Sequence, residues 1–148
     1  MRRDSRLSVA LHVLLHMNES SEPFTSERLG EMLEANPVVV RRTLSRLKAA
    51  GLLTGAKGHG GGWLLARPLG EVRLSDVYEA LETGSPFAIA PRNESPGCLI
   101  ERAVNRAISG ALDDAEKVLR QSFARHTLDA IAKDVRDASR PARRRSAR

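Results

Sequence analysis

The chain has 148 residues, a length that suits one domain or one domain with an appended helical arm. Its single cysteine excludes an intrachain disulfide framework, and its aromatic content of 3% argues against a base-stacking platform for single-stranded nucleic acid. No apolar stretch is long enough to cross a bilayer, and no cleavage site of small residues follows the apolar run near the N-terminus. We therefore expect a soluble cytoplasmic protein with no membrane partner.

The net charge of +6 is distributed unevenly along the chain. Residues 35–70 contain six Lys and Arg side chains and no Asp or Glu, and residues 139–148 add five Arg. The segments 1–34 and 71–138 each carry a small excess of acidic residues. Positive charge concentrated in this way favours a polyanion partner more strongly than the same charge spread evenly.

The first two predicted elements are amphipathic helices. Apolar residues recur at helical spacing over residues 5–17, which predicts the first helix. After a polar connection, Thr25 or Ser26 can cap a second helix that runs to about Glu34.

The third predicted helix carries most of the basic side chains of residues 35–70. Asn36 is a good N-cap and Pro37 suits the first helical position, so the helix should begin there. Gly51 is a suitable left-handed C-cap and should end it. The buried face of the helix should consist of three apolar residues, Val40, Leu44 and Leu47.

A two-stranded hairpin should follow the third helix. Its strands are predicted at residues 52–54 and 63–66, on either side of a glycine-rich loop. Ser75 should then cap a short helix over residues 76–82. Residues 83–97 are rich in Gly, Pro and Ser and are expected to form a loop.

A long helix is predicted from Cys98 to about Phe123, because apolar residues form a stripe over roughly seven turns. A helix this long outside a compact domain needs a partner, and a second copy of itself is the simplest one. A last helix should span residues 127–138, and the Arg-rich residues 139–148 should be a disordered tail that touches DNA nonspecifically or only aids solubility. The expected homodimer interface consists of Ile100, Val104, Ile108, Leu112, Ala115 and Leu119.

These elements predict a mainly α fold: a winged helix-turn-helix with a two-stranded wing and a long C-terminal dimerisation helix. The predicted organisation is a DNA-binding domain at 1–82, a linker at 83–97, a helical dimerisation arm at 98–138 and a basic tail at 139–148.

In this fold the third helix enters a groove of double-stranded DNA and the wing lies against the neighbouring backbone. Val38 and Val39 can contact thymine methyl groups, and Arg41 and Arg42 can reach guanine edges or phosphates. Glycines in the wing let the backbone approach the sugar-phosphate wall. The full predicted DNA-binding set is Asn36, Val38, Val39, Arg41, Arg42, Ser45, Arg46, Lys48, Lys57, Gly58, His59, Gly60 and Gly61.

Several motifs resemble the Rrf family of bacterial winged-helix regulators, which includes the iron–sulfur cluster regulator and the nitric-oxide-sensitive repressor. The specific motifs lie in the third helix and the wing, and weaker similarity follows at residues 74–77 and 127–131. The resemblance implies a dimeric regulator, here a repressor, that binds a near-palindromic operator. The specific motifs are Asn36-Pro37-Val38-Val39-Val40-Arg41-Arg42, Leu47-x-x-x-Gly51-Leu52-Leu53 and Lys57-Gly58-His59-Gly60-Gly61-Gly62-Trp63-Leu64-Leu65.

Cluster-binding members of that family carry three closely spaced cysteines before the long helix, whereas this chain has only Cys98 there. One thiolate cannot supply the three or four ligands of a cluster, so no cofactor is expected. Cys98 remains a candidate redox or effector switch, because a helix N-terminus stabilises the reactive thiolate. The alternative is an unreactive cysteine.

Other classes of function require residue groups of their own. His12 and His16 lie one turn apart, but they share a polar stripe without an acidic third ligand, so we expect no metal site. No nucleophile–base pair or carboxylate pair predicts an enzyme. The alternatives to a regulator are a nonspecific architectural DNA-binding protein and a helical protein-interaction module that uses the helix-turn-helix as a scaffold.

Overall fold

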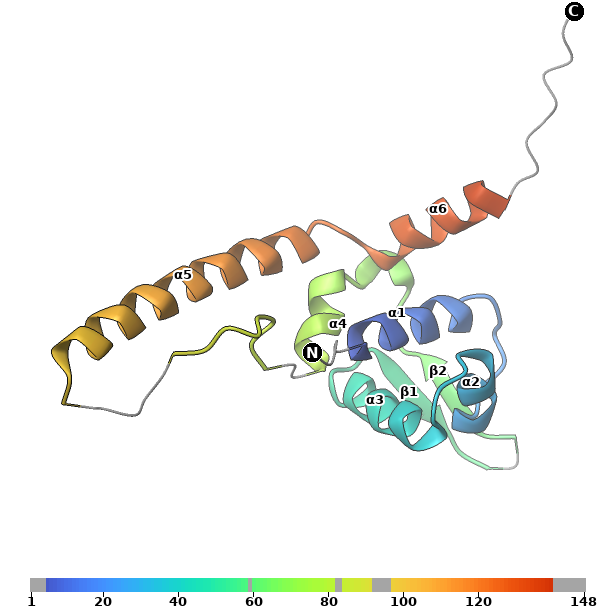
Figure 1. Ribbon diagram of the computed structural model, residues 1–148. Helices are drawn as coiled ribbons and strands as arrows, with labels where there is room; N and C mark the ends of the chain where they lie inside the picture. The colour runs from blue at the N-terminus through green and yellow to red at the C-terminus, as the bar shows by residue number, and fades with distance from the viewer. Residues whose placement is uncertain (1–4, 59, 82–83, 92–96, 140–148) are drawn as a thin grey trace, which may run out of the picture.

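The computed structural model describes residues 5–58, 60–81, 84–91 and 97–139 (Figure 1). Helices and a two-stranded sheet form a compact body, from which one long helix extends before the chain returns to the body. The elements are α1 (Arg6–Met17), α2 (Ser26–Met32), α3 (Pro37–Ala49), β1 (Leu53–Ala56), β2 (Gly62–Leu65), the 3-10 turn η1 (Leu69–Glu71), α4 (Leu74–Ala80), α5 (Leu99–Phe123) and α6 (Leu128–Ser139). The fold is mainly helical with a two-stranded antiparallel wing, as predicted.

The start of α2 and both ends of α3 form as their sequences predict, whereas α2 ends at Met32, two residues before the predicted Glu34. Oγ1 of Thr25 accepts the backbone N–H of Arg28 at 3.1 Å, and Oδ1 of Asn36 accepts that of Val38 at 2.9 Å. At the end of α3, Gly51 has a φ of +72°, which glycine adopts without strain. This conformation turns the chain directly into the wing.

The wing strands pair antiparallel, with Leu53 opposite Leu65 and Ala56 opposite Gly62. Their bounds differ by one or two residues from the predicted 52–54 and 63–66. The N–H of Leu52 donates to the carbonyl of Leu47 at 2.9 Å, so this residue completes the end of α3 instead of starting the strand.

The predicted cap of α4 is wrong. Ser75 lies inside the first turn and is buried, with only 8% of its surface exposed. The carboxylate of Asp76 instead accepts the N–H of Arg73 at 2.8 Å. The helix starts earlier than predicted because its first residue is held by a distant segment: the N–H of Leu74 donates to the carbonyl of His126 at 2.9 Å.

The apolar core is shared between α1, α2, α3, α4, the wing and α6. Val40, Leu44 and Leu47 of α3 are fully buried, as predicted, and Leu128 and Ala132 of α6 join the same cluster. By contrast, none of the residues of α5 is buried. The helix α6 therefore packs on the body, while α5 leaves it (Figure 1). Across the residues described, no helix is both long and apolar enough to span a membrane.

Candidate nucleic-acid interface

The α3 helix presents an apolar tip at its N-terminus. Three valines follow Pro37, and the third, Val40, is buried in the core. Val38 and Val39 point the other way, with 69% and 48% of their surfaces exposed. Two neighbouring valines left open at a helix start provide an apolar surface of the kind that thymine methyl groups contact.

The α2–α3 turn holds this tip in place. Gly30 of α2 lies against the start of α3, where a Cβ atom would come within 3.0 Å of the carbonyl of Ala35 and 3.1 Å of the Pro37 side chain. A larger residue would push the two helices apart. The close approach therefore sets the geometry of the helix-turn-helix.

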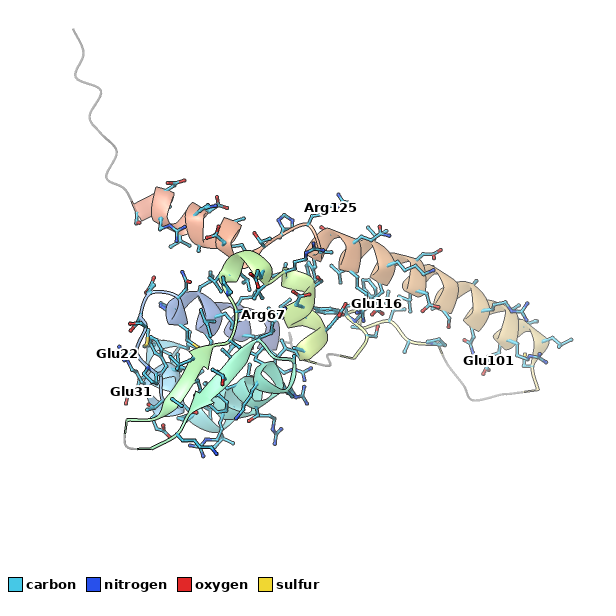
Figure 2. All side chains as sticks on the ribbon, turned by 180° about the vertical axis from the view of Figure 1, so that it is seen from behind. Glu22, Glu31, Arg67, Glu101, Glu116 and Arg125 are labelled. Atoms are coloured by element: carbon cyan, nitrogen blue, oxygen red, sulfur yellow. The ribbon has the colours of Figure 1, made fainter. Side chains whose placement is uncertain are left out.

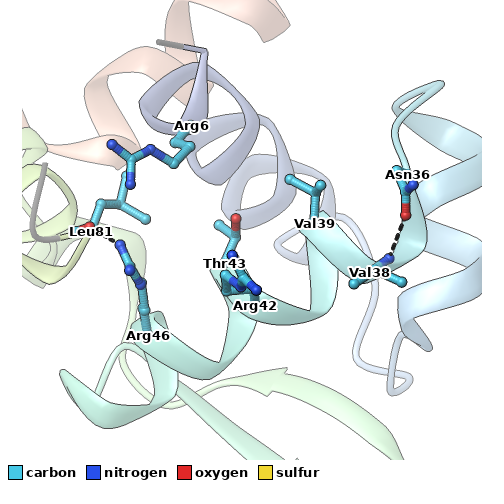
Figure 3. Close-up of a pocket in the computed structure, with 8 residues that line it drawn as sticks. All are labelled: Arg6, Asn36, Val38, Val39, Arg42, Thr43, Arg46 and Leu81. Atoms are coloured by element: carbon cyan, nitrogen blue, oxygen red, sulfur yellow. Dashed lines mark hydrogen bonds between the residues drawn. The ribbon is translucent and has the colours of Figure 1, made fainter.

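A shallow groove of about 320 Å³ runs along α3 (Figure 3). The exposed side of α3, the start of α1 and the end of α4 form its walls, so Arg6, which the sequence did not single out, lies beside the predicted reading residues. Three arginines give the groove a positive character suited to a phosphate backbone. The lining residues are Arg6, Asn36, Val38, Val39, Arg42, Thr43, Arg46 and Leu81.

The arginines of α3 differ in what they contact. Nη2 of Arg41 pairs with Oε1 of Glu27 on α2 at 2.9 Å, and both side chains are exposed. Arg42 is exposed in the groove, whereas Nη1 of Arg46 donates to the carbonyl of Leu81 (Figure 3). Sequence reasoning missed Glu27, because no local spacing connects two residues fourteen positions apart.

The remaining predicted residues of α3 lie toward its C-terminal half. Ser45 is exposed and donates from its hydroxyl to the carbonyl of Arg41 at 2.9 Å. Lys48 lies over the wing, since its Nζ would be 3.3 Å from a Cβ atom at Gly55. The amine of Lys48 therefore carries positive charge toward the wing.

The tip of the wing depends on its glycines. Gly58 and Gly60 have φ values of +101° and +80°, and a Cβ atom on Gly61 would lie 2.5 Å from the carbonyl of Ala56. Lys57 is exposed beside them, while the predicted contact His59 lies outside the described residues. Among its described residues, the tip of the hairpin thus presents backbone and the cation of Lys57.

The wing is attached to α2 through Trp63. The backbone groups of Trp63 and Phe24 exchange two hydrogen bonds, at 2.8 and 3.0 Å. The indole Nε1 also donates to Oγ of the buried Ser26 at 3.1 Å. These contacts place the wing and the helix-turn-helix in one rigid arrangement.

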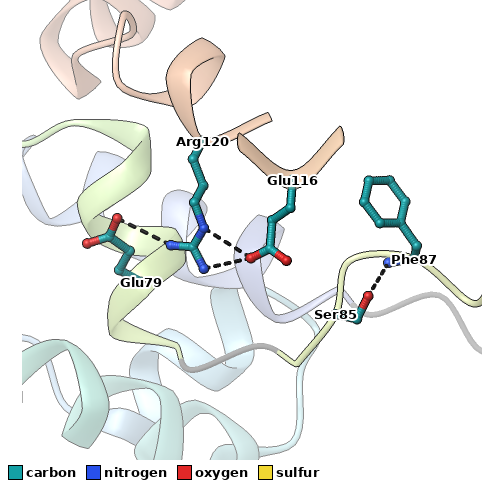
Figure 4. A network of polar contacts seen from close by, with 5 residues as sticks. All are labelled: Glu79, Ser85, Phe87, Glu116 and Arg120. Carbon is teal, nitrogen blue, oxygen red and sulfur yellow. Dashed lines mark hydrogen bonds and ion pairs between the residues drawn. The ribbon is translucent and has the colours of Figure 1, made fainter. Parts of the chain in front are cut away.

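Arg120 joins α5 to the body (Figure 4). Its guanidinium contacts Glu116 on the same helix at 2.8 and 3.0 Å, and reaches Glu79 of α4 at 3.4 Å. It also lies 5.3 Å from the ring centroid of Tyr78. The hydrogen bond to Glu116 is the main cause that raises the pKa of Arg120 above its ordinary value, so the guanidinium stays charged at any physiological pH.

The predicted apolar stripe of α5 is exposed at the far end of the helix and half-buried nearer the body. Ile100 and Val104 are 75% and 50% exposed, at the end of the helix furthest from the body. Figure 2 shows this separation, with Glu101 at the far end of α5 and Glu116 near the body. Ile108, Leu112 and Leu119 are half-buried and Ala115 is exposed. An amphipathic helix with an open apolar stripe is suited to a partner helix.

Cys98 is exposed and lies directly before α5. Within the described ranges, no three His, Cys, Asp or Glu side chains are grouped so that they could hold a metal ion. His12 and His16 lie with ring centroids 6.0 Å apart, and His16 contacts Glu19 at 3.5 Å. An acidic side chain therefore lies beside His16, one turn further along the chain, which the sequence analysis did not expect.

Known proteins resemble this chain in sequence. A family model described as Rrf2, iron-dependent transcriptional regulator, matches residues 3–134. The candidate HTH-type transcriptional regulator YwnA of Bacillus subtilis is 30% identical over 125 residues, which cover 84% of this chain and 92% of YwnA. The HTH-type transcriptional regulator IscR of Xenorhabdus nematophila is 33% identical over 78 residues, covering 51% of this chain and 45% of IscR.

Solved structures resemble it in fold. A candidate transcriptional regulator from Lactobacillus plantarum aligns with a TM-score of 0.75 at 25% identity, covering 89% of this chain and 90% of that one. The structure of IscR from T. potens aligns with a TM-score of 0.67 at 16% identity, covering 95% and 93%. The second likeness concerns the fold alone.

Proposed function

Because the chain belongs to the Rrf2 family of transcriptional regulators, we propose that it is a homodimeric repressor that binds a near-palindromic operator in the bacterial cytoplasm. The observation that supports this most is the exposed face of α3, where two open valines lie beside arginines in a positively charged groove. The apolar tip supplies contacts to bases, and the cations supply attraction to phosphates. A dimer bound in this way blocks the DNA that it covers, so repression needs no further surface.

The residues of the interface have different roles in this proposal. Val38, Val39, Arg41 and Arg42 read bases, with Asn36 setting the start of the helix. Ser45, Arg46 and Lys48 hold phosphates, and Lys57 to Gly61 form the wing contact. The apolar stripe of α5 pairs with its copy in the second protomer, which places two reading helices on two half-sites.

The family description names iron, but the residues here do not fit an iron–sulfur cluster. The chain has one cysteine, and Cys98 is exposed without a group of ligands around it in the described part of the chain. We therefore derive no step through a cluster. Cys98 is proposed only as a redox-responsive thiol at the start of α5, where a change would act on the dimer helix.

The proposal is tested by DNA selection and by two matched variants. Purified protein should enrich specific fragments of its source genome. Lys57→Ala should weaken binding to the selected operator and to unrelated sequences alike. It should also reduce by about one the slope of the logarithm of the binding constant against the logarithm of the salt concentration. Arg41→Ala should in addition relax the preference at particular bases, with a loss of about 1–3 kcal/mol on the preferred sequence. Equal behaviour of the two variants would contradict this division of roles.

The same experiments separate the alternatives. An architectural protein would bind the operator and unrelated DNA equally well at fixed salt. A protein-interaction module would keep its activity when Arg41 and Arg42 are both replaced. For Cys98, the response of DNA binding to oxidant should disappear in Cys98→Ser, and an unchanged response would remove the redox role.

A further inference from the structure

The starting observation is an acidic residue at the reading surface. Residues 35–70 contain no Asp or Glu, so α3 and the wing carry no negative side chain of their own. Glu27 brings one to α3 from α2, where its Oε1 lies 2.9 Å from Nη2 of Arg41. The two side chains are 62% and 63% exposed, so the pair lies on the surface and not in the core.

Folding stability gives no strong reason for this pair. Exposed ion pairs contribute little to stability, because solvent screens them and both side chains lose conformational freedom. A carboxylate beside a phosphate-binding surface also weakens the attraction to DNA at every sequence. The pair therefore lowers the general affinity for DNA. The effect that compensates for this loss is the orientation that Glu27 imposes on the Arg41 side chain.

That effect follows from the geometry of guanidinium. The group is planar and has five N–H donors in a fixed fork, so holding one nitrogen also sets the direction of the others. Glu27 engages Nη2 of Arg41 and leaves donors for a second partner. Two such donors are what the bidentate contact to O6 and N7 of guanine requires. An arginine held in place before binding also loses less freedom when the contact forms.

We propose that Glu27 is a positioning residue that makes Arg41 specific for guanine at one position of each half-site. This inference rests on the proposed function and adds a residue of α2 to base selection. Glu27 lowers the affinity for DNA in general and raises the preference of Arg41 for one base. It has no direct base contact in this role.

The chain offers a matched control on the same helix. Glu31 lies one turn after Glu27 on α2 and is exposed. It forms no ion pair with any residue that the structure describes, and Figure 2 shows its position on the outer side of the body. Glu27→Gln and Glu31→Gln remove the same charge from the same helix, but only the first replaces the charged partner of Arg41 with a neutral, weaker acceptor.

The test measures binding of the full chain to its selected operator and to operators in which each guanine is replaced in turn, at fixed salt. In the unmodified protein, one replacement should weaken binding about 5- to 150-fold, the range of one bidentate contact. Glu27→Gln should make this loss of binding about two- to tenfold smaller, because the Arg41 side chain must then be ordered when the contact forms. Glu31→Gln should leave it unchanged, and both variants should bind unrelated DNA slightly more tightly.

Two further variants separate the outcomes. In Arg41→Ala, adding Glu27→Gln should change no base preference, because the side chain that Glu27 orients is absent. Arg41→Lys keeps the charge without the fork and should show the reduced penalty. If Arg41→Ala reduces the preference for guanine at one position while Glu27→Gln reduces it at none, the inference is wrong and the proposed function stands. If the unmodified protein shows no base preference, both are wrong.

Discussion

Arg46 of α3 donates a hydrogen bond from Nη1 to the backbone carbonyl of Leu81, the residue that ends α4 (Figure 3). The carbonyls at a helix C-terminus have no partner within the helix and carry partial negative charge. The positive guanidinium satisfies one of them and ties α3 to α4. Arg46 is also half-buried, unlike its exposed neighbour Arg42. A residue predicted to hold phosphate thus has a structural contact as well.

This contact predicts different effects for two arginines of the same helix. Arg46→Ala should lower the free energy of unfolding by about 1–3 kcal/mol, because it removes a charged hydrogen bond and leaves a carbonyl without a partner. Arg42→Ala should leave unfolding within about 0.5 kcal/mol of the unmodified protein, since its side chain is exposed. Urea unfolding followed by circular dichroism measures both. Equal stability of the two variants would show that the contact with Leu81 does not contribute to the free energy of unfolding.

The parts of the fold that local chemistry determines could be predicted from the sequence. Asn36 and Gly51 act as predicted because capping depends on residues within one helical turn. Ser75 was predicted wrongly because a distant segment, at His126, holds the first residue of α4. The partners of Arg41 and Arg46 could not be predicted for the same reason, since each contact joins elements that are far apart in sequence.

The wing provides a test that separates backbone geometry from charge. Gly61→Ala should force the tip apart, because the new Cβ atom would lie 2.5 Å from the carbonyl of Ala56. We expect DNA binding to weaken at every sequence and stability to fall by about 1–3 kcal/mol, as for other overpacked sites. Gly70→Ala is the control, because its Cβ atom would meet nothing within 4 Å. Normal binding by Gly61→Ala would show that the tip does not contact DNA.

The proposed dimer can be broken from the open stripe of α5. Val104→Asp places a charge on an apolar position that is 50% exposed in the single chain, and burying that charge against a partner would be unfavourable. The variant should be monomeric by sedimentation and should lose most of its affinity for a two-half-site operator. Arg102→Asp introduces the same residue on the opposite face of the helix and should remain dimeric. If both variants remain dimeric, α5 is not the interface.

Arg120 tests whether the contact between α4 and α5 sets the distance between the two α3 helices of the proposed dimer. Arg120→Ala removes the contacts to Glu79 and Glu116 and the position over Tyr78. The α5 stripe and the α3 face are untouched, so dimerisation and binding to a single half-site should persist. The preference among operators with different half-site spacings should become broader, because the angle between α5 and the body is less fixed. Lys117→Ala is the control, since Lys117 pairs only with Asp114 of its own helix among the contacts described, at 3.1 Å. A spacing preference that is equally sharp in both variants would exclude this role, because a joint that sets the spacing must broaden it when its contacts are lost.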